Sequence, residues 1–239
     1  MGVVKNIVVT GHRSGLGKAI FERLELDGFN VVGFDLKDGF DVCQPGRLPK
    51  PQFTSIPSFC EGDDEKTQVL INCAGINLNQ WFEEVDFASF TEVMDTNAFS
   101  FVSMTQWLLD DLKTSKGCVI NIVSNAANIP MTSSLAYNAS KAAGLMITKQ
   151  MAHELTPKYG ITVFSISPNK LRGTEMSKKI EDNVCKVRGW TPEYAAEYQK
   201  KALMHGLETE PDNIASLISH LLLSGSYKFM SGTDLPFGK

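Results

Sequence analysis

The sequence predicts a three-layer α/β fold, in which a doubly wound parallel sheet is covered by helices on both faces. Three observations support this prediction. Short runs rich in β-branched residues alternate with longer amphipathic segments, the runs are nearly continuous in apolar residues, and a glycine-rich turn, TGHRSGLG, follows the first run. A chain of 239 residues is long enough for one large domain with a substantial core, so we expect residues 1–239 to form a single domain.

The elements follow in order along the chain. We expect strands at 6–10, 30–34, 69–72, 118–124 and 162–167, with a brief further strand at 40–42. The strand at 40–42 lies within residues 36–68, where four prolines leave no room for a helix of normal length. Apolar residues at helical spacing predict helices over 85–112 and 134–156. Residues 175–210 are polar and helical, are interrupted by RGWTP, and are expected to leave the sheet as an excursion.

Composition and charge exclude several classes of function. The hydrophobic content of 43% and net charge of −4 are ordinary, so neither a nucleic acid nor an anionic membrane is expected as a partner. We find no apolar run of about 20 residues and no signal-peptide pattern. The five cysteines are an odd number without a C-x-x-C pair, which favours reduced thiols over a disulfide framework or a metal site. We therefore expect a cytoplasmic protein that acts on a small molecule.

The glycine-rich turn has the composition of a phosphate-binding turn. Gly11, Gly15 and Gly17 lie between a predicted strand and a predicted helix, where backbone amides and the helix dipole attract an anion. Three glycines could also serve only to make a tight turn. Asp35 favours the first interpretation, because it ends the second predicted strand, 24 positions after Gly11, where dinucleotide sites place an acid for the ribose hydroxyls.

Four polar residues are candidates for chemistry. Tyr137 and Lys141 are four apart on one helical face, although such pairs are also common on helix surfaces. An ammonium about 4 Å from the phenol would favour the phenolate by roughly 4 kcal/mol, enough to bring the pKa of tyrosine near 7. Ser124 ends a predicted strand and is either a hydrogen-bond donor to a substrate carbonyl or a turn serine. Asn97 interrupts an apolar helix face and is either a structural pin or part of a polar relay.

These motifs together resemble the short-chain dehydrogenase/reductase family in its roughly 250-residue form, which has a Rossmann-type fold. TGHRSGLG is similar to its T-G-x-x-x-G-x-G, NCAG at 72–75 to its N-N-A-G, and Y-x-x-x-K is matched by Tyr137 and Lys141. Ser124 stands 13 residues before Tyr137, as in the family, and Asn97 matches the family's catalytic asparagine. The resemblance extends from residue 6 to about residue 237.

The resemblance implies roles for the four candidates. Tyr137 would be the general acid–base, and Ser124 would orient and polarise the substrate oxygen. Lys141 would lower the pKa of Tyr137 and bind the nicotinamide ribose, while Asn97 would hold a water that connects Lys141 to solvent. The implied reaction is the interconversion of a secondary alcohol and a ketone by hydride transfer.

The resemblance also implies a set of cofactor contacts. They are Gly11, Ser14, Gly15, Leu16 and Gly17 at the diphosphate, Asp35 and Leu36 beside the adenosine ribose, Asp41 and Val42 at the adenine, Asn72, Ala74 and Gly75 on the adenosine and ribose side, Tyr137 and Lys141 at the nicotinamide ribose, and Pro168, Leu171 and Thr174 near the carboxamide. The segment SPNKLRGT (167–174) departs from the family, because Asn169 replaces the usual glycine after the proline and the threonine comes about one position late.

The expected cofactor is NAD(H). Asp35 would meet a 2′-phosphate as a like charge at short range, whereas Arg13 and Lys37 are basic residues that favour NADP(H). The family's strongest NADP positions are occupied by Ser14 and Leu36, so we expect a preference for NAD(H) of at least about tenfold. The alternative function is a regulatory or structural protein that binds a dinucleotide on the same fold without catalysis.

Two further expectations concern the lid and assembly. Residues 175–210 are expected to cover the substrate pocket as a mobile lid, with Met176, Trp190 and Met204 as candidate pocket residues. The helices at 85–112 and 134–156 carry more apolar or small surface than one sheet face needs. The family usually pairs these helices with their symmetry mates, which implies a homodimer or homotetramer.

Overall fold

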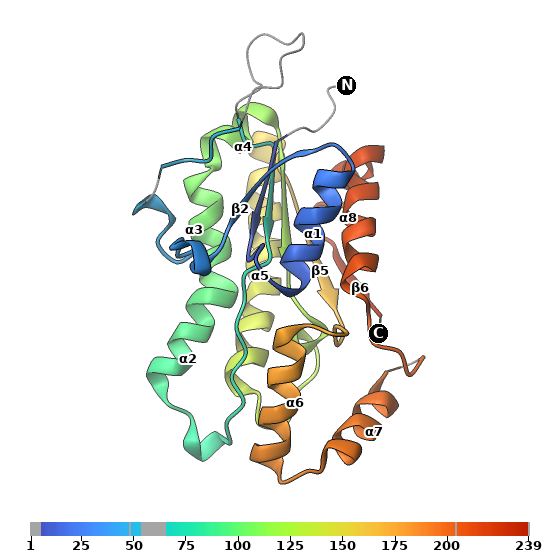
Figure 1. The fold of residues 1–239 in the computed structure, drawn as a ribbon. Helices are drawn as coiled ribbons and strands as arrows, with labels where there is room; N and C mark the ends of the chain where they lie inside the picture. Colours follow the sequence, from blue (N-terminus) through green and yellow to red (C-terminus); the bar gives the residue numbers. More distant parts are fainter. Residues whose placement is uncertain (1–5, 48, 54–65, 204, 239) are drawn as a thin grey trace.

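A six-stranded parallel sheet forms the centre of the molecule (Figure 1). The structure is a computed structural model that describes residues 6–47, 49–53, 66–203 and 205–238. The strands of the described chain are β1 (Asn6–Thr10), β2 (Asn30–Phe34), β3 (Val69–Asn72), β4 (Cys118–Ile122), β5 (Thr162–Pro168) and β6 (Asp234–Phe237), in the spatial order β2-β1-β3-β4-β5-β6. The strand order reverses between β1 and β3, so the carboxyl ends of these strands are where this fold binds a ligand.

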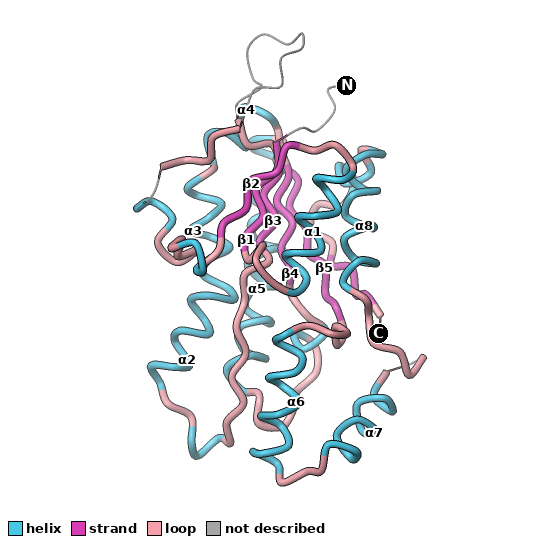
Figure 2. The backbone as a smooth tube through the Cα atoms, in the orientation of Figure 1, coloured by secondary structure: helices cyan, strands magenta, loops and turns pink. Residues whose placement is uncertain are grey.

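Helices cover both faces of the sheet, as the α/β prediction requires (Figure 2). One face carries α1 (Gly15–Leu26) and α8 (Pro211–Ser224); the other carries α3 (Ser100–Trp107), α4 (Leu109–Ser115) and α5 (Leu135–Tyr159). The side chains of β1 alternate between the two layers: Ile7 and Val9 belong to the core beneath α1 and α8, and Val8 to the core beneath α3 to α5. A strand buried on both faces is apolar throughout, which is why these runs were recognisable in the sequence.

The segment 85–112 is not one continuous helix, contrary to the prediction. After a short 3₁₀ turn (Phe82–Glu84), it consists of α2 (Phe87–Met94), a π-helical turn (Asp95–Phe99), α3 and α4. The π-helical turn contains Asn97, and a break between α3 and α4 falls at Leu108, whose backbone leaves helical geometry. The predicted apolar face is confirmed, because Val93, Phe101 and Leu108 are all buried.

The predicted strand at 40–42 is also wrong. Gly39, with φ of 80°, ends a 3₁₀ turn (Leu36–Asp38), and Asp41 accepts a hydrogen bond from the Cys43 amide at 2.8 Å, which bends the chain. Phe40 is buried against Phe34 and Trp107, so the apolar residues here fill a gap in the core without joining the sheet. The strand predicted at 118–124 ends earlier, at Ile122, and Ser124 caps a 3₁₀ turn (Asn125–Ala127).

Two helices extend beyond the carboxyl ends of the strands (Figure 1). They are α6 (Glu175–Arg188) and α7 (Pro192–Ala202), separated at the expected interruption by Gly189, with φ of 66°, and by Thr191, which caps α7. None of the helices in the described part of the chain combines the length and hydrophobicity that a membrane span needs. Cys43, Cys73, Cys118 and Cys185 are free thiols, and Cys60 lies outside the described residues.

Candidate active site

The glycine-rich turn is built around two positions that exclude a side chain. Gly11 has φ of 72°, and a Cβ there would lie 2.9 Å from the Cα of Ala74. A Cβ on Gly17 would lie 2.2 Å from the carbonyl oxygen of Gly11. The first helical turn of α1 therefore lies directly on the backbone at Gly11. That backbone also contacts Ala74, just after the end of β3. This contact fixes the start of α1 at the switch point of the sheet.

The start of α1 presents backbone amides, with no acidic residue in its first turn. Ser14 is the N-cap but makes no side-chain capping bond, and the first turn contains no Asp or Glu. Leu16 is buried in the core, so it contributes only its backbone to the surface of the turn. Amides of this kind and the helix dipole bind phosphate groups. The residues present thus fit a dinucleotide diphosphate.

Asp35 is held in place by two backbone amides. Its Oδ2 accepts from the Arg13 amide at 3.0 Å and its Oδ1 from the Lys37 amide at 2.9 Å. The residue is 9% exposed and caps the 3₁₀ turn that follows β2, while neighbouring Leu36 is 75% exposed. Each carboxylate oxygen retains a second lone pair, so the group can still accept hydrogen bonds from ribose hydroxyls.

Three of the expected cofactor contacts have other partners in the structure. The Asp41 carboxylate bonds its own turn, and Val42 is buried in the core with Phe40. The Asn72 amide donates to Asn121 at 2.8 Å, within a buried network that continues to Thr148 on α5. The contacts of all three residues in the structure stabilise the fold, and their roles at the cofactor stay predictions.

A residue that sequence reasoning did not assign to the site, Thr10, shapes the turn after β3. Its hydroxyl oxygen accepts from the amides of Cys73 and Ala74, at 3.0 and 3.1 Å. This bond explains why a threonine precedes the first glycine of the motif, since it ties the end of β1 to the end of β3. Ala74 is thereby placed beside Gly11.

Asn97 is fixed by three hydrogen bonds. Its amide oxygen accepts from the Ile76 amide at 2.8 Å, and its amide nitrogen donates to the Ile76 carbonyl at 2.8 Å and to the Ser140 hydroxyl at 3.0 Å. The π-helical turn aims this side chain at the chain segment after β3. Asn97 is therefore a structural pin between three segments, and Ser140 is a partner that the sequence did not reveal.

Lys141 lies in the same place, almost completely buried. Its ammonium donates to the Ile122 carbonyl at the end of β4, at 3.0 Å. A Cβ on Gly75 would lie 3.2 Å from Asn97 Oδ1 and 3.8 Å from Lys141 Nζ, so these three residues meet at the end of the sheet. Burial lowers the pKa of Lys141 from 10.5 to about 8.

Tyr137 and Ser124 complete the set. The Lys141 ammonium is 5.7 Å from the centroid of the Tyr137 ring, farther than the close contact assumed from the sequence. Burial raises the pKa of Tyr137, and a hydrogen bond from Ser124 opposes this only in part. The expected lowering of the tyrosine pKa by Lys141 is thus not found in this structure, because desolvation of the phenolate outweighs the effect of its neighbours.

Residues 168–174 are anchored beside the glycine turn. A Cβ on Gly15 would lie 3.6 Å from the side chain of Thr174, which caps α6 by accepting from the Ser177 amide. Leu171 pairs with Thr209 in an isolated bridge. Asn169, at the position of the family's glycine, bonds both Thr209 and the Gly238 carbonyl, and so ties this segment to the end of the chain. Pro168 ends β5.

The comparison with known proteins decides the family. The family model described as short chain dehydrogenase matches residues 58–184, more than half of the chain. The chain belongs to the short-chain dehydrogenase/reductase family. The NAD-dependent glycerol dehydrogenase of Listeria innocua is 29% identical over 244 residues, covering 97% of this chain and 91% of that protein.

Solved structures of the family share the fold at lower sequence identity. An NAD⁺-bound xylitol dehydrogenase is 20% identical, with a TM-score of 0.82 and coverage of 98% of each chain. An actinorhodin polyketide ketoreductase with NADPH is also 20% identical, with a TM-score of 0.81 and coverage of 98% of this chain and 96% of that one. The comparisons thus show that this chain belongs to a family of oxidoreductases and has a Rossmann-type fold.

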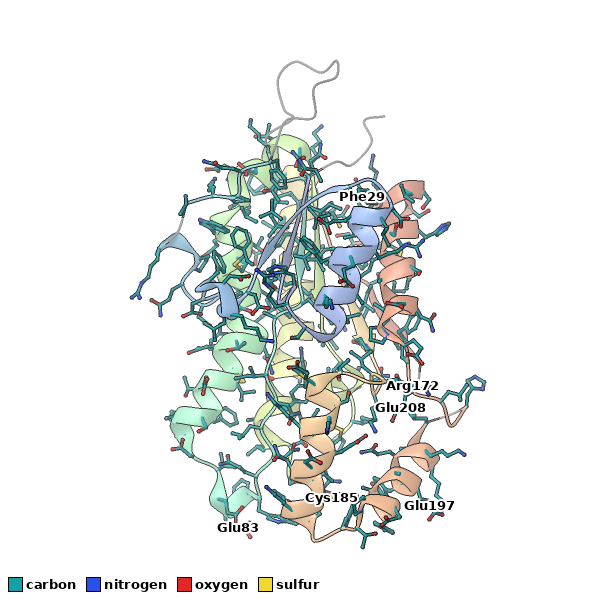
Figure 3. The ribbon with its side chains drawn as sticks, in the orientation of Figure 1. Phe29, Glu83, Arg172, Cys185, Glu197 and Glu208 are labelled. Atoms are coloured by element: carbon teal, nitrogen blue, oxygen red, sulfur yellow. The ribbon has the colours of Figure 1, made fainter. Side chains whose placement is uncertain are left out.

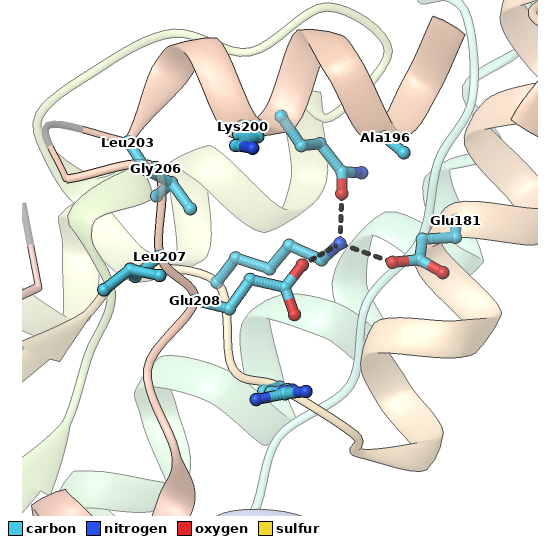
Figure 4. Close-up of a pocket in the computed structure, with 10 residues that line it drawn as sticks. Glu181, Ala196, Lys200, Leu203, Gly206, Leu207 and Glu208 are labelled. Atoms are coloured by element: carbon cyan, nitrogen blue, oxygen red, sulfur yellow. Dashed lines mark hydrogen bonds and ion pairs between the residues drawn. The ribbon is translucent and has the colours of Figure 1, made fainter. Parts of the chain in front are cut away.

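In this dehydrogenase/reductase, α6 and α7 are tied to the sheet by one lysine. Lys170 follows β5 and contacts Glu181 on α6, Gln199 on α7 and, at 2.6 Å, Glu208 (Figure 4). Burial lowers the pKa of Lys170, but its hydrogen bonds to Glu181 and Glu208 outweigh this and raise it. A cavity of about 380 Å³ adjoins this cluster. Figure 3 shows Arg172 and Glu208 at this end of the molecule, far from Phe29 at the other.

The far end of α6 has its own contacts. Trp81 donates to the Val187 carbonyl at 2.7 Å, and Arg188 bonds Ser133 and the Thr132 carbonyl in the segment before α5. The Trp190 ring contacts the Arg188 guanidinium, meets Tyr194 edge-on and lies tilted against Tyr198. This candidate pocket residue is therefore part of an aromatic cluster between α6 and α7. Met176 is 37% exposed, and Met204 lies outside the described residues.

Proposed function

We propose that this chain is an NAD(H)-dependent oxidoreductase that interconverts a secondary alcohol and a ketone, with Tyr137 as the acid–base. The observation that carries the proposal is the meeting of Asn97, Ser124, Tyr137 and Lys141 at the carboxyl end of the sheet, beside a turn that fits a diphosphate. Membership of an oxidoreductase family and an NAD-dependent alcohol-oxidising relative are consistent with this chemistry.

Each of the four side chains has a separate role in the proposed reaction. When bound, NAD(H) supplies or accepts the hydride. The Ser124 oxygen accepts from the Ala126 amide at 3.1 Å, which orients the side chain. Its hydroxyl bonds Tyr137 in this structure and would donate to the substrate oxygen when substrate is bound. Tyr137, kept protonated by burial, donates its proton to that oxygen as a ketone is reduced, and its phenolate takes the proton back as an alcohol is oxidised.

Lys141 and Asn97 support this proton transfer. The buried ammonium of Lys141 stabilises the phenolate when it forms and would bind the nicotinamide ribose. Asn97 holds Gly75 and the segment after β3 in position, and a water near its side chain would connect Lys141 to solvent. Because Lys141 titrates near pH 8, its proton is available for exchange close to neutrality.

Asp35 supports the choice of NAD(H). Its carboxylate is fixed by the Arg13 and Lys37 amides at the position proposed for the ribose hydroxyls. A 2′-phosphate there would meet this charge directly, so we expect NAD(H) to bind at least about tenfold more tightly than NADP(H). Similar proteins include both NAD⁺-bound and NADPH-bound structures, so the preference must be measured for this chain.

The second candidate function is a dinucleotide-binding regulatory or structural protein. Asn97, Ser124, Tyr137 and Lys141 argue against it, because such a role needs no tyrosine beside a buried lysine. Turnover of a panel of ketones and secondary alcohols with NAD(H) and NADP(H) separates the two functions. Turnover supports the enzyme, whereas tight dinucleotide binding without turnover on the whole panel supports the regulator.

The lid and the assembly are further parts of this proposal. Residues 175–210 would close over the substrate, with Lys170 as the anchor of α6 and α7. The apolar side chains of Phe87 on α2, Phe99 in the π-helical turn and Met146 on α5 are 80%, 50% and 63% exposed, and they support pairing of these helices with a second copy. Light scattering at micromolar concentration should give the mass of a dimer or tetramer; a monomer would contradict the pairing. Location in the cytoplasm stays a prediction from the sequence.

A further inference from the structure

Asp38, a residue to which the sequence assigned no role, holds the arginine side chain of the glycine-rich turn. Arg13 Nε donates to both carboxylate oxygens of Asp38, at 3.0 and 2.9 Å, and Arg13 Nη2 donates to Oδ1 at 2.7 Å. The hydrogen bonds between these partners raise the pKa of Arg13 and lower that of Asp38, so both stay charged at neutral pH. These bonds engage one donor edge of the guanidinium, its Nε–H and one Nη2–H, and place a carboxylate against its charge.

This ion pair lies beside the position proposed for the ribose. The backbone amide of Arg13 donates to Asp35 Oδ2, so the arginine side chain starts one residue from the carboxylate that would accept the ribose hydroxyls. NADP(H) differs from NAD(H) by a phosphate on one of those hydroxyls. Arginine binds phosphate through paired donors, and a free Arg13 here would be well placed to do so.

The other basic groups nearby also face carboxylates. His12 Nε2 lies 3.6 Å from Asp38 Oδ2, on the side of Asp38 away from its bonds to Nη2 of Arg13. Lys37 Nζ lies 4.0 Å from Glu175 at the start of α6, a long and exposed contact. Of the two acids, Asp38 makes the closer and more directional contacts, so it has the greater influence on what the turn can bind.

We propose that Asp38 is a specificity-determining residue, which keeps Arg13 from a 2′-phosphate and thereby sustains the preference for NAD(H). The inference rests on the proposed dinucleotide site. It adds a second effect to the repulsion of a 2′-phosphate by Asp35. Arg13, the cation that could bind that phosphate, is already bound by the Asp38 carboxylate. Removing Asp38 should therefore convert Arg13 from a bound partner into a phosphate ligand.

The test is a double-mutant cycle on dinucleotide affinity. Dissociation constants for NADH and NADPH are measured by fluorescence titration, at one ionic strength, for wild type, Asp38→Ala, Arg13→Ala and the double variant. We expect Asp38→Ala to tighten NADPH binding by about tenfold while NADH changes by less than about threefold. The gain should vanish in the double variant, because it depends on Arg13. Asp110→Asn, at an exposed acid on α4 that pairs with Lys113, is the matched control for charge and should leave both constants unchanged.

The outcomes separate this inference from the proposed function. An unchanged ratio of the two constants in Asp38→Ala, or a gain that persists without Arg13, would overturn the role of Asp38. Asp38→Asn, which keeps the size of the side chain, should shift the ratio in the same direction and covers the case in which the alanine variant fails to fold. Wild-type protein that binds neither dinucleotide would contradict the dinucleotide site itself, and wild-type protein that prefers NADPH would overturn the inference and the NAD(H) preference together.

Discussion

The cofactor end of the site and the lid are held together by different forces. At the cofactor end, Gly11, Gly17, Thr10 and Asn97 fix the backbone through close contacts and buried hydrogen bonds to main-chain groups. In the lid, α6 and α7 depend on the charged contacts of Lys170 and on aromatic side chains at the surface. Buried contacts with one geometry make a rigid site, whereas exposed ion pairs contribute little stability and exchange readily with water.

The different forces in these two regions fit the different roles proposed for them. In the proposed function, Asn97, Ser124, Tyr137 and Lys141 hold a proton donor and a dinucleotide at fixed distances, and a close-packed sheet edge is suited to that. A substrate must enter and leave, and a lid attached by the half-buried Lys170 and by contacts at the surface would open at low cost. The predictions below test this division, from the largest expected effect to the smallest.

The largest effect is expected at Tyr137. Tyr137→Phe removes the proton donor without changing the shape of the ring, so turnover should fall by about 10²–10⁴-fold. Affinity for the dinucleotide should stay within a few-fold, because the glycine-rich turn is untouched. Steady-state kinetics and NADH titration measure the two effects, and turnover near the wild-type rate would remove Tyr137 from the acid–base role.

The next effect concerns the buried charge of Lys141. Its pKa is about 8 in the folded chain, against 10.5 for an exposed lysine, so between these pH values only the unfolded chain keeps the proton. Stability conferred by this group is therefore greatest above pH 10.5 and is lost as the pH falls through 8, a change of about 3 kcal/mol. Denaturant unfolding of wild type and Lys141→Met across this range should show that difference, and identical pH profiles would contradict it.

A smaller effect is expected where the glycine turn meets α1. Gly17→Ala places a methyl group 2.2 Å from the Gly11 carbonyl, which the rigid backbone cannot accommodate without shifting. We expect a loss of about 1–3 kcal/mol in the free energy of unfolding and weaker NADH binding. Gly46→Ala is the control, because a Cβ there meets no atom within 4 Å. Equal stability and affinity in the two variants would show that the turn is not rigid.

The smallest effect is expected in the lid. Lys170→Met removes the contacts to Glu181, Gln199 and Glu208 at once. Amide exchange in α6 and α7 should become faster, and KM for the substrate should rise about three- to tenfold with kcat nearly unchanged. Lys179→Met, at an exposed lysine of α6, should change neither. Exchange in α6 and α7 that is equally slow in both variants, and unaffected by cofactor and substrate, would argue for a permanently closed lid.

The sequence predicted the features that depend on neighbouring residues. The buried strands, the glycine-rich turn, Asp35 and the Tyr137/Lys141 pair all show as local composition or short spacing. The contacts that needed the tertiary structure were missed: Arg13 reaches Asp38 across 25 positions, and Asn97 reaches Ser140 across 43. The strand β6 was not predicted either, because its four residues include a proline and lie at the edge of the sheet.

The expectations for the segment after β2 failed for a related reason. The sequence around Asp41 is short and apolar enough to be a strand, but Phe40 and Val42 fill a gap beside Trp107 and the Asp41 carboxylate closes a turn. The pKa of Tyr137 could not be inferred from its spacing to Lys141, because burial of the phenol, which only the fold determines, has the larger effect. Spacing located the pair correctly but did not give its environment.

Transfer of isotope from cofactor to substrate tests the catalytic claim most directly. The protein is incubated with NADH deuterated at the transferring position and a ketone, and the alcohol formed is examined by mass spectrometry. We predict one deuterium on the carbinol carbon with wild-type protein, and about 10²–10⁴-fold slower transfer with Tyr137→Phe. Tight binding of NADH without deuterium transfer to any ketone of the panel would contradict catalysis and support the regulatory alternative.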